Sequence, residues 1–121
     1  MRINLFGAGY VGLVTAACLA EHGNQVLCID IDQEKVKRLK QGECPIHEPD
    51  LPALLQKNLA AGRLHFSTDP QQGVEHGFYQ FITVGTPQDK DGSADLTYAL
   101  DVARYIGKTL TEPKLIINKS L

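Results

Sequence analysis

The fold of this 121-residue chain is decided by the stretch Ile3-Asn4-Leu5-Phe6-Gly7-Ala8-Gly9-Tyr10-Val11-Gly12-Leu13. A short apolar run ends at a G-x-G-x-x-G turn, and beyond it apolar residues recur every three or four positions, at Leu13, Ala16, Ala17 and Ala20. The pattern predicts a strand, a glycine turn and a helix. In such a turn Gly7 permits the sharp bend, Gly9 lets backbone N–H groups approach a diphosphate, and Gly12 lets the helix pack closely on the strand. The helix start then faces the anion with unpaired N–H groups and a partial positive charge.

An acidic residue strengthens this interpretation, because glycines at a turn can also serve chain geometry alone. Asp30 ends a second apolar run, 18 positions after Gly12, close to the spacing of about 20 at which a carboxylate binds the adenosine ribose of a dinucleotide. That carboxylate repels a 2′-phosphate, and Ile31 and Asp32 offer no arginine to receive one, so the sequence favours NAD over NADP. Lys35 can reach back toward the ribose, or it is an ordinary solvated lysine.

The rest of the chain alternates strand-like and helix-like segments. Strands are predicted at 26–29, 63–67, 78–84 and 115–117. Helices are predicted to begin at an Asp32 cap, at Pro49 and at Asp69-Pro70, and the last helix is expected to bury Leu96, Ala99, Leu100, Ala103, Ile106 and Leu110. Such alternation implies right-handed crossovers and a parallel sheet. We expect an α/β fold, a Rossmann-type doubly wound parallel sheet of order 3-2-1-4-5, truncated after about the fifth strand.

A further motif, Val84-Gly85-Thr86-Pro87, follows the fourth predicted strand. In the expected strand order this segment lies beside the glycine turn, where ligands of such sheets bind. The alternative is that Gly85 and Pro87 only terminate the strand and Thr86 caps the turn. The candidate cofactor-binding residues are Gly7, Gly9, Tyr10, Val11, Gly12, Asp30, Lys35, Val84, Gly85 and Thr86.

Composition argues against several other functions. The formal net charge is −2 and the Lys and Arg residues are scattered, so no nucleic-acid partner is indicated. No apolar run approaches the roughly 20 residues that cross a bilayer, and no signal-peptide core precedes the first strand, so we expect no membrane partner and a cytoplasmic location. The histidines are scattered and the three cysteines have no paired spacing. We therefore expect no metal site and reduced thiols at Cys18, Cys28 and Cys44, with Cys28 filling the core.

These motifs resemble those of the UDP-glucose/GDP-mannose dehydrogenase family along the whole chain. Phe6–Leu13 is similar to the family's opening motif, and Pro45-Ile46-His47-Glu48-Pro49 followed by Leu51 is similar to its P-I-x-E-P-x-L segment. Val84–Pro87 and Asp91–Leu96 resemble later motifs, and the second of them is most similar to members that oxidise UDP-glucose.

The resemblance implies roles for individual residues. Val11 belongs to the glycine-turn site, Asp30 and Lys35 bind the adenosine side, and Thr86 contacts NAD. The last three residues, Lys119-Ser120-Leu121, resemble a K-S-T motif in which leucine takes the place of a cofactor-contacting threonine.

The resemblance also implies an enzyme. Family members oxidise the C6 alcohol of a nucleotide sugar to the acid with two NAD, through a thioester on a cysteine, and none of the three cysteines here matches that nucleophile. Residues 1–121 are then an incomplete N-terminal NAD-binding domain without the catalytic and sugar-binding domains, and we expect the isolated chain to be inactive. The implied substrate is UDP-glucose, with GDP-mannose and UDP-N-acetylmannosamine as alternatives. A hypothesis of another class is a non-catalytic NAD-binding module. An uncovered edge after the last strand would favour self-association into a homo-oligomer.

Overall fold

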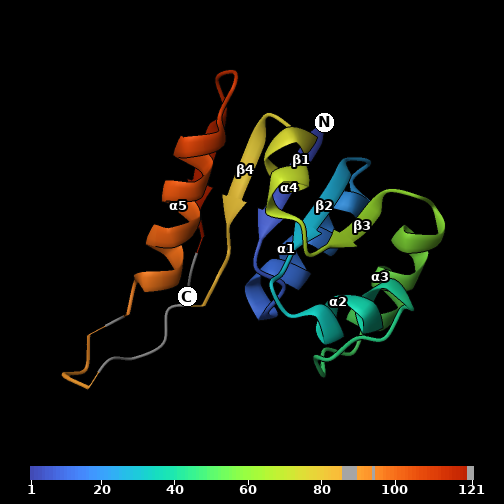
Figure 1. Cartoon of the computed structure of the whole chain (residues 1–121). Helices are drawn as coiled ribbons and strands as arrows, with labels where there is room; N and C mark the ends of the chain where they lie inside the picture. The colour runs from blue at the N-terminus through green and yellow to red at the C-terminus, as the bar shows by residue number, and fades with distance from the viewer. Residues whose placement is uncertain (86–89, 94, 120–121) are drawn as a thin grey trace.

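The computed structural model describes residues 1–85, 90–93 and 95–119, which form a five-stranded sheet flanked by helices (Figure 1). In chain order the elements are β1 (Arg2–Phe6), α1 (Tyr10–Glu21), β2 (Gln25–Ile29), α2 (Gln33–Lys40), α3 (Leu51–Ala60), β3 (Leu64–Ser67), α4 (Pro70–His76), β4 (Tyr79–Ile82), α5 (Thr97–Thr109) and β5 (Leu115–Asn118). The strands pair in parallel in the order β3-β2-β1-β4-β5. The predicted fold class and strand order are confirmed.

Both faces of the central strands are buried, and successive residues of each strand divide between them. Ile3 and Leu5 of β1 belong to a core closed by α1, α2 and α3, whereas Phe6 belongs to a second core closed by α4 and α5. Strands covered on both faces need apolar residues at consecutive positions, which is why the run 26–29 predicted β2 correctly. Because β1, β2 and β4 are parallel, the loops that carry the candidate residues all leave from one edge of the sheet.

The structure agrees with the predicted helix starts, with one exception. The predicted caps Asp32 and Asp69 each accept a hydrogen bond at 3.1 Å from an N–H in the first turn of α2 and of α4. The prediction for Pro49 was wrong, because α3 begins at Leu51 and has Pro52 in its first turn. A proline is tolerated at either place, since the first N–H groups of a helix have no partner within the helix, so the sequence does not distinguish the two.

The predicted buried face of α5 was wrong in part. Leu96 and Leu100 are 50% and 49% exposed, and Ala103 is exposed as well. Ile106 is buried, and the residues that pack beside it on the second core are Ala99, Val102, Tyr105 and Leu110. α5 lies toward the β4 side of the sheet (Figure 1), where only a narrow strip of the helix has a surface to cover.

β5 forms one edge of the sheet within the described residues. It pairs with β4, and its Leu115 and Ile116 are 45% and 42% exposed, so the expected uncovered edge is present. Over the same ranges, no helix combines the length and apolar character needed to cross a bilayer.

Two buried amides join the middle of the sheet to α4. The Asn4 side-chain amide donates to the Gln80 side-chain oxygen at 2.9 Å. The Gln80 amide lies 3.1, 3.2 and 3.0 Å from the carbonyls of Gly73, Val74 and Gly77. Gln80 therefore binds the last carbonyls of α4, which a helix end leaves without partners.

Candidate functional site

The glycine turn joins β1 to α1 and packs against the end of β4. Gly7 has a φ of +109°, and its N–H donates to the Ile29 carbonyl at 2.7 Å, which ties the turn to β2. A β-carbon on Gly7 would lie 2.7 Å from backbone atoms of Thr83 and Val84. Only glycine fits here, because the left-handed backbone and the contact with β4 both exclude a side chain.

Thr83, which the sequence analysis missed, fixes the turn to β4. Its hydroxyl oxygen lies 2.9 Å from the Gly7 carbonyl and 3.0 Å from the Phe6 carbonyl, and its N–H donates to the Phe6 carbonyl at 2.8 Å. β4 ends at Ile82, earlier than predicted, yet these bonds hold the chain beyond it beside β1. The signal that could have identified Thr83 is a hydroxyl residue inside an apolar run, two positions before Gly85.

The first turn of α1 is open to solvent on the groove side. Gly9 is its N-cap residue, and within the described part of the chain no side chain caps the helix and no acidic residue lies in its first turn. A β-carbon on Gly9 would meet nothing within 4 Å, whereas one on Gly12 would lie 1.8 Å from the Gly7 carbonyl oxygen. The uncapped N–H groups and the positive end of the helix dipole form a site suited to an anion.

Asp30 follows β2 and points to the same turn. One carboxylate oxygen accepts a hydrogen bond from the Ala8 N–H at 2.9 Å, and the other accepts from the Asp32 N–H at 2.9 Å. The Lys35 ammonium lies 3.7 Å from the first of these oxygens, and the Asp30 side chain is only 14% exposed. The structure thus brings the predicted acid, the predicted lysine and the glycine turn together, with the carboxylate held by two backbone donors.

A groove of about 640 Å³ runs past these groups along the carboxyl edge of the sheet. Six of the predicted residues line it: Gly7, Gly9, Asp30, Lys35, Val84 and Gly85. Ile31 and the α5 residues Tyr98, Asp101, Val102 and Tyr105, which the sequence analysis did not select, contribute further walls. A mostly apolar groove of this size with a few convergent polar groups is typical of a cofactor site.

Three of the other four predicted residues, Tyr10, Val11 and Gly12, do not line the groove. Gly12 is buried under the turn, and Val11 is partly buried in the first turn of α1. Tyr10 is 49% exposed, and its hydroxyl donates to a Glu48 carboxylate oxygen at 3.3 Å. The pKa of Tyr10 is raised, mainly by the negative charge of Glu48 and to a smaller extent by this hydrogen bond. Thr86 lies outside the described residues, as do Pro87, Ala94, Ser120 and Leu121.

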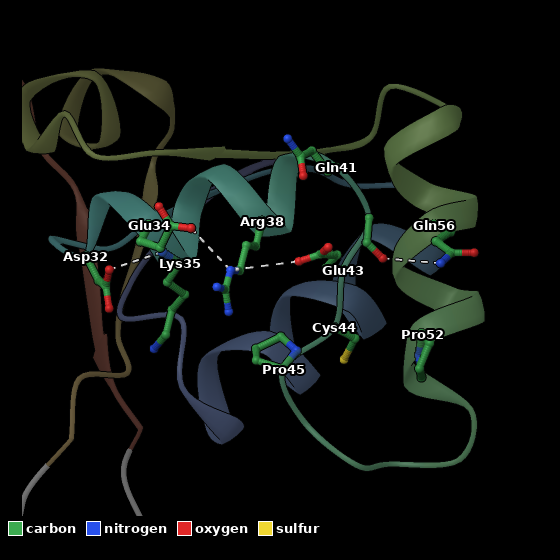
Figure 2. A pocket seen from close by; sticks show the side chains of 11 residues that line it. Asp32, Glu34, Lys35, Arg38, Gln41, Glu43, Cys44, Pro45, Pro52 and Gln56 are labelled. Carbon is green, nitrogen blue, oxygen red and sulfur yellow. Dashed lines mark hydrogen bonds and ion pairs between the residues drawn. The ribbon is translucent and has the colours of Figure 1, made fainter.

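A larger groove, of about 730 Å³, lies between α2 and α3 (Figure 2). Arg38 extends into it, with its Nε 3.3 Å from a Glu34 carboxylate oxygen and 4.0 Å from one of Glu43. Lys35 lines both grooves. Because this larger groove reaches neither the glycine turn nor Asp30, and its arginine is already paired with two carboxylates, the smaller groove is the better candidate for a cofactor.

None of the three thiols lines the smaller groove. Cys28 is buried below the turn, and its Sγ donates to the Gly7 carbonyl at 3.7 Å. Burial is the main cause that raises the pKa of Cys28 to about 12, and the negative charge of Asp30 adds to it. This thiol therefore stays protonated and fills the core as predicted. Within the described residues no group of three or more His, Cys, Asp or Glu side chains is arranged to hold a metal ion.

A doubly wound parallel sheet with an anion site where its first strand enters a helix, and an anchored carboxylate after its second strand, defines a dinucleotide-binding domain of the Rossmann class. The site fits such a ligand, since the open space at Gly9 lets a diphosphate reach the N–H groups of the turn. Residues 1–121 match the model described as UDP-glucose/GDP-mannose dehydrogenase family, NAD binding domain. The chain belongs to this family, and its cofactor is NAD.

Known relatives support the assignment of the chain to this family. A UDP-glucose 6-dehydrogenase of Pseudomonas aeruginosa is 50% identical over 120 residues, which cover 99% of this chain and 26% of that relative. A GDP-mannose 6-dehydrogenase of the same species is 45% identical over 112 residues, covering 93% of this chain and 26% of the relative. The crystal structure of a ternary complex of GDP-mannose dehydrogenase from Pseudomonas aeruginosa matches with a TM-score of 0.94 at 41% identity, over 99% of this chain and 28% of that one. The chain therefore spans about a quarter of the length of the curated relatives it matches, and it corresponds to their N-terminal NAD-binding domain.

Proposed function

We propose that the chain serves an enzyme that oxidises the C6 alcohol of UDP-glucose to the carboxylate of UDP-glucuronate, with two NAD reduced per sugar. The support is the identity of 50% with a UDP-glucose 6-dehydrogenase, against 45% with a GDP-mannose 6-dehydrogenase, together with the UDP-glucose-like motif at Asp91–Leu96. The competing substrates are GDP-mannose and UDP-N-acetylmannosamine. NADH formation by an enzyme containing this chain tests the choice, and a higher kcat/KM with either competitor would replace the proposal.

The roles of the site residues follow from the groove. Gly7 shapes the turn, the backbone N–H groups of Gly9, Tyr10, Val11 and Gly12 bind the diphosphate, and the Asp30 carboxylate accepts hydrogen bonds from the adenosine ribose. Lys35 adds a positive charge beside that ribose, and the segment Val84-Gly85-Thr86 forms the opposite wall. When bound, NAD supplies the acceptor for a hydride, and the residues of this chain position it.

The observation that carries the cofactor site is the Asp30 carboxylate, fixed against the glycine turn by the Ala8 N–H at 2.9 Å. Calorimetric titration with NAD and NADP tests it. We expect the wild type to prefer NAD, and Asp30→Asn to lose at least about tenfold in NAD affinity, because a hydrogen bond to a charged acceptor is worth about 1.5–3 kcal/mol. Asp32→Asn is the matched control, since it removes the same charge from a residue that does not line the smaller groove. Equal affinity for NAD and NADP in the wild type would contradict this site.

We further propose that residues 1–121 are an incomplete domain whose isolated form binds NAD without turnover. The support is the position of the thiols: Cys28 is buried with a raised pKa, Cys18 is exposed on α1, and Cys44 lines the larger groove. None of them lines the groove at the glycine turn. The test is NADH formation from UDP-glucose by the isolated chain, and a measurable rate would refute this proposal.

A further inference from the structure

Thr83 is a buried polar residue in an otherwise apolar segment. It follows β4 in the run Phe81-Ile82-Thr83-Val84, and it is only 5% exposed. A valine would fill the same space without a polar atom, and a buried hydroxyl is unfavourable unless it is hydrogen-bonded. The packing of this segment alone therefore does not account for a threonine, and the partners of its hydroxyl indicate its function.

The Thr83 hydroxyl has one hydrogen to donate and two carbonyls within reach. The Phe6 carbonyl, 3.0 Å from the hydroxyl oxygen, already accepts a hydrogen bond from the Thr83 N–H at 2.8 Å. The Gly7 carbonyl is nearer to the hydroxyl, at 2.9 Å, and the Cys28 thiol, which is a weak donor, lies 3.7 Å from it. The hydroxyl hydrogen is therefore needed most at Gly7.

The Gly7 carbonyl belongs to the same peptide unit as the Ala8 N–H. That unit is planar and trans, so its carbonyl and its N–H point in opposite directions. The Ala8 N–H donates to a carboxylate oxygen of Asp30 at 2.9 Å. One rigid peptide is thus held on one side by Thr83, which follows β4, and on the other by Asp30, which follows β2, with the end of β1 between them.

The orientation of this peptide affects how the Asp30 carboxylate is held. The Ala8 N–H donates to one carboxylate oxygen and the Asp32 N–H to the other, both at 2.9 Å. A Gly7 carbonyl without its hydroxyl partner leaves the peptide free to rotate, and rotation turns the Ala8 N–H away from Asp30. Hydrogen bonds on the two sides of one peptide also polarise each other, so the loss of one weakens the other.

We propose that Thr83 is a positioning residue for the cofactor: through the Gly7–Ala8 peptide it holds the Asp30 carboxylate in the direction that accepts hydrogen bonds from the adenosine ribose. The inference rests on the proposed NAD site and adds to it a residue from the far side of β1. Thr83 lines the smaller groove, but its hydroxyl is bonded to backbone carbonyls, so its effect on the ligand is exerted through Asp30.

The experiment is a double-mutant cycle on NAD affinity, measured by calorimetric titration. We expect Thr83→Val to lower the affinity about fivefold, the effect of one uncharged hydrogen bond. In the Asp30→Ala background the peptide has no carboxylate to hold, so the same substitution should change the affinity by less than about twofold. Thr83→Ser keeps the hydroxyl and should retain the wild-type affinity. A role in folding alone would lower the affinity equally in both backgrounds.

A second measurement needs no ligand. Hydrogen exchange followed by nuclear magnetic resonance reports whether the Ala8 N–H is bonded, and Thr83→Val should accelerate exchange at Ala8. Thr109→Val is the matched control, since it removes a hydroxyl that donates to the Tyr105 carbonyl at 2.8 Å, and Thr109 does not line the smaller groove. It should change neither the exchange at Ala8 nor the NAD affinity. Thermal unfolding verifies that each variant folds.

Three results would overturn the inference. They are equal NAD affinity of Thr83→Val and the wild type, a fivefold effect that persists in the Asp30→Ala background, and unchanged exchange at Ala8 in Thr83→Val. A wild type that does not bind NAD would instead reject the proposed NAD site, and this inference with it.

Discussion

Gly9 and Gly12 stand three residues apart at the start of one helix, and the structure gives them different reasons to lack a side chain. A β-carbon on Gly12 would collide with the Gly7 carbonyl oxygen at 1.8 Å, so the protein itself excludes it. A β-carbon on Gly9 would meet nothing within 4 Å. The requirement at Gly9 therefore points to something that approaches the turn from outside, as a bound diphosphate does.

Gly9→Ala should leave the fold intact and weaken NAD binding. The unfolding free energy should fall by at most about 1 kcal/mol, the usual cost of a poor N-cap residue. NAD affinity should fall at least about tenfold, because the methyl group keeps the diphosphate from the N–H groups. Chemical denaturation and calorimetric titration measure the two effects. A variant with unchanged NAD affinity would show that the diphosphate does not bind against Gly9.

Gly12→Ala should instead destabilise the protein whether or not NAD is present. The added carbon has to displace the turn, at a cost of about 3 kcal/mol or more. Gly107→Ala is the control, since its β-carbon meets nothing within 4 Å and the residue lies inside α5. There alanine should stabilise by about 0.5–1 kcal/mol. Equal stabilities of the two variants in urea denaturation would contradict the packing seen at the turn.

Among the helices and strands, those predicted correctly are the ones whose sequence signal lies within a few consecutive residues. β2 was predicted because it is a continuous apolar run, β1 because its apolar residues lead into the glycine turn, and α2 and α4 because an aspartate caps each. The proximity of Asp30 to the turn also followed, since spacing and strand order imply it. The buried face of α5 was predicted only in part, because Leu96, Leu100 and Ala103 extend its apolar side beyond the strip that packs on the second core. The groove-lining role of Tyr98 and Asp101 depends on the placement of that strip.

The Gln80 side chain should be a major link between β4 and α4. Gln80→Leu keeps a similar volume but leaves the Asn4 amide and the carbonyl oxygens at the end of α4 without this partner. We expect a loss of about 3 kcal/mol in unfolding free energy. Gln33→Leu, on the exposed side of α2, should change it by no more than about 0.5 kcal/mol. A loss below about 1 kcal/mol for Gln80→Leu, measured by urea denaturation, would show that water replaces these bonds.

At the scale of the whole molecule, stability should depend on pH through His76, which lies at the amino end of the sheet. Its Nε2 lies 3.0 Å from the Gln25 carbonyl, and its Nδ1 lies 3.3 Å from the Arg2 guanidinium. Burial lowers the pKa of His76; the Gln25 carbonyl opposes this, and the charges of Arg2, His65 and Lys114 add smaller decreases.

The sign of the pH effect follows from that lowered pKa. As pH falls through about 6.5, the unfolded chain takes up a proton at His76 that the folded chain does not, so unfolding free energy decreases from about pH 7.5 to pH 5.5. His76→Gln should reduce this slope, which chemical denaturation at a series of pH values measures. Identical slopes in the variant and the wild type would assign the pH dependence to other groups.

The exposed edge strand should promote self-association. Leu115 and Ile116 of β5 are both more than 40% exposed, and unpaired edge strands offer backbone groups to a second copy. Light scattering should show the mean mass rising with protein concentration, and Ile116→Lys should reduce this rise. Leu100→Lys, which places the same charge on α5, should reduce it less. A monodisperse monomer at high concentration would contradict the expectation.

The hydroxyl of Thr83 bridges the glycine turn from a position 76 residues further along the chain. The site at the start of α1 is therefore assembled from two segments far apart in the sequence, and it is incomplete until β4 pairs with β1. A collapsed intermediate built from residues 1–67 alone lacks that support, so NAD should select the finished chain over partly folded forms. Excess cofactor should therefore raise the free energy of unfolding, since a ligand that binds only the native state stabilises it by mass action.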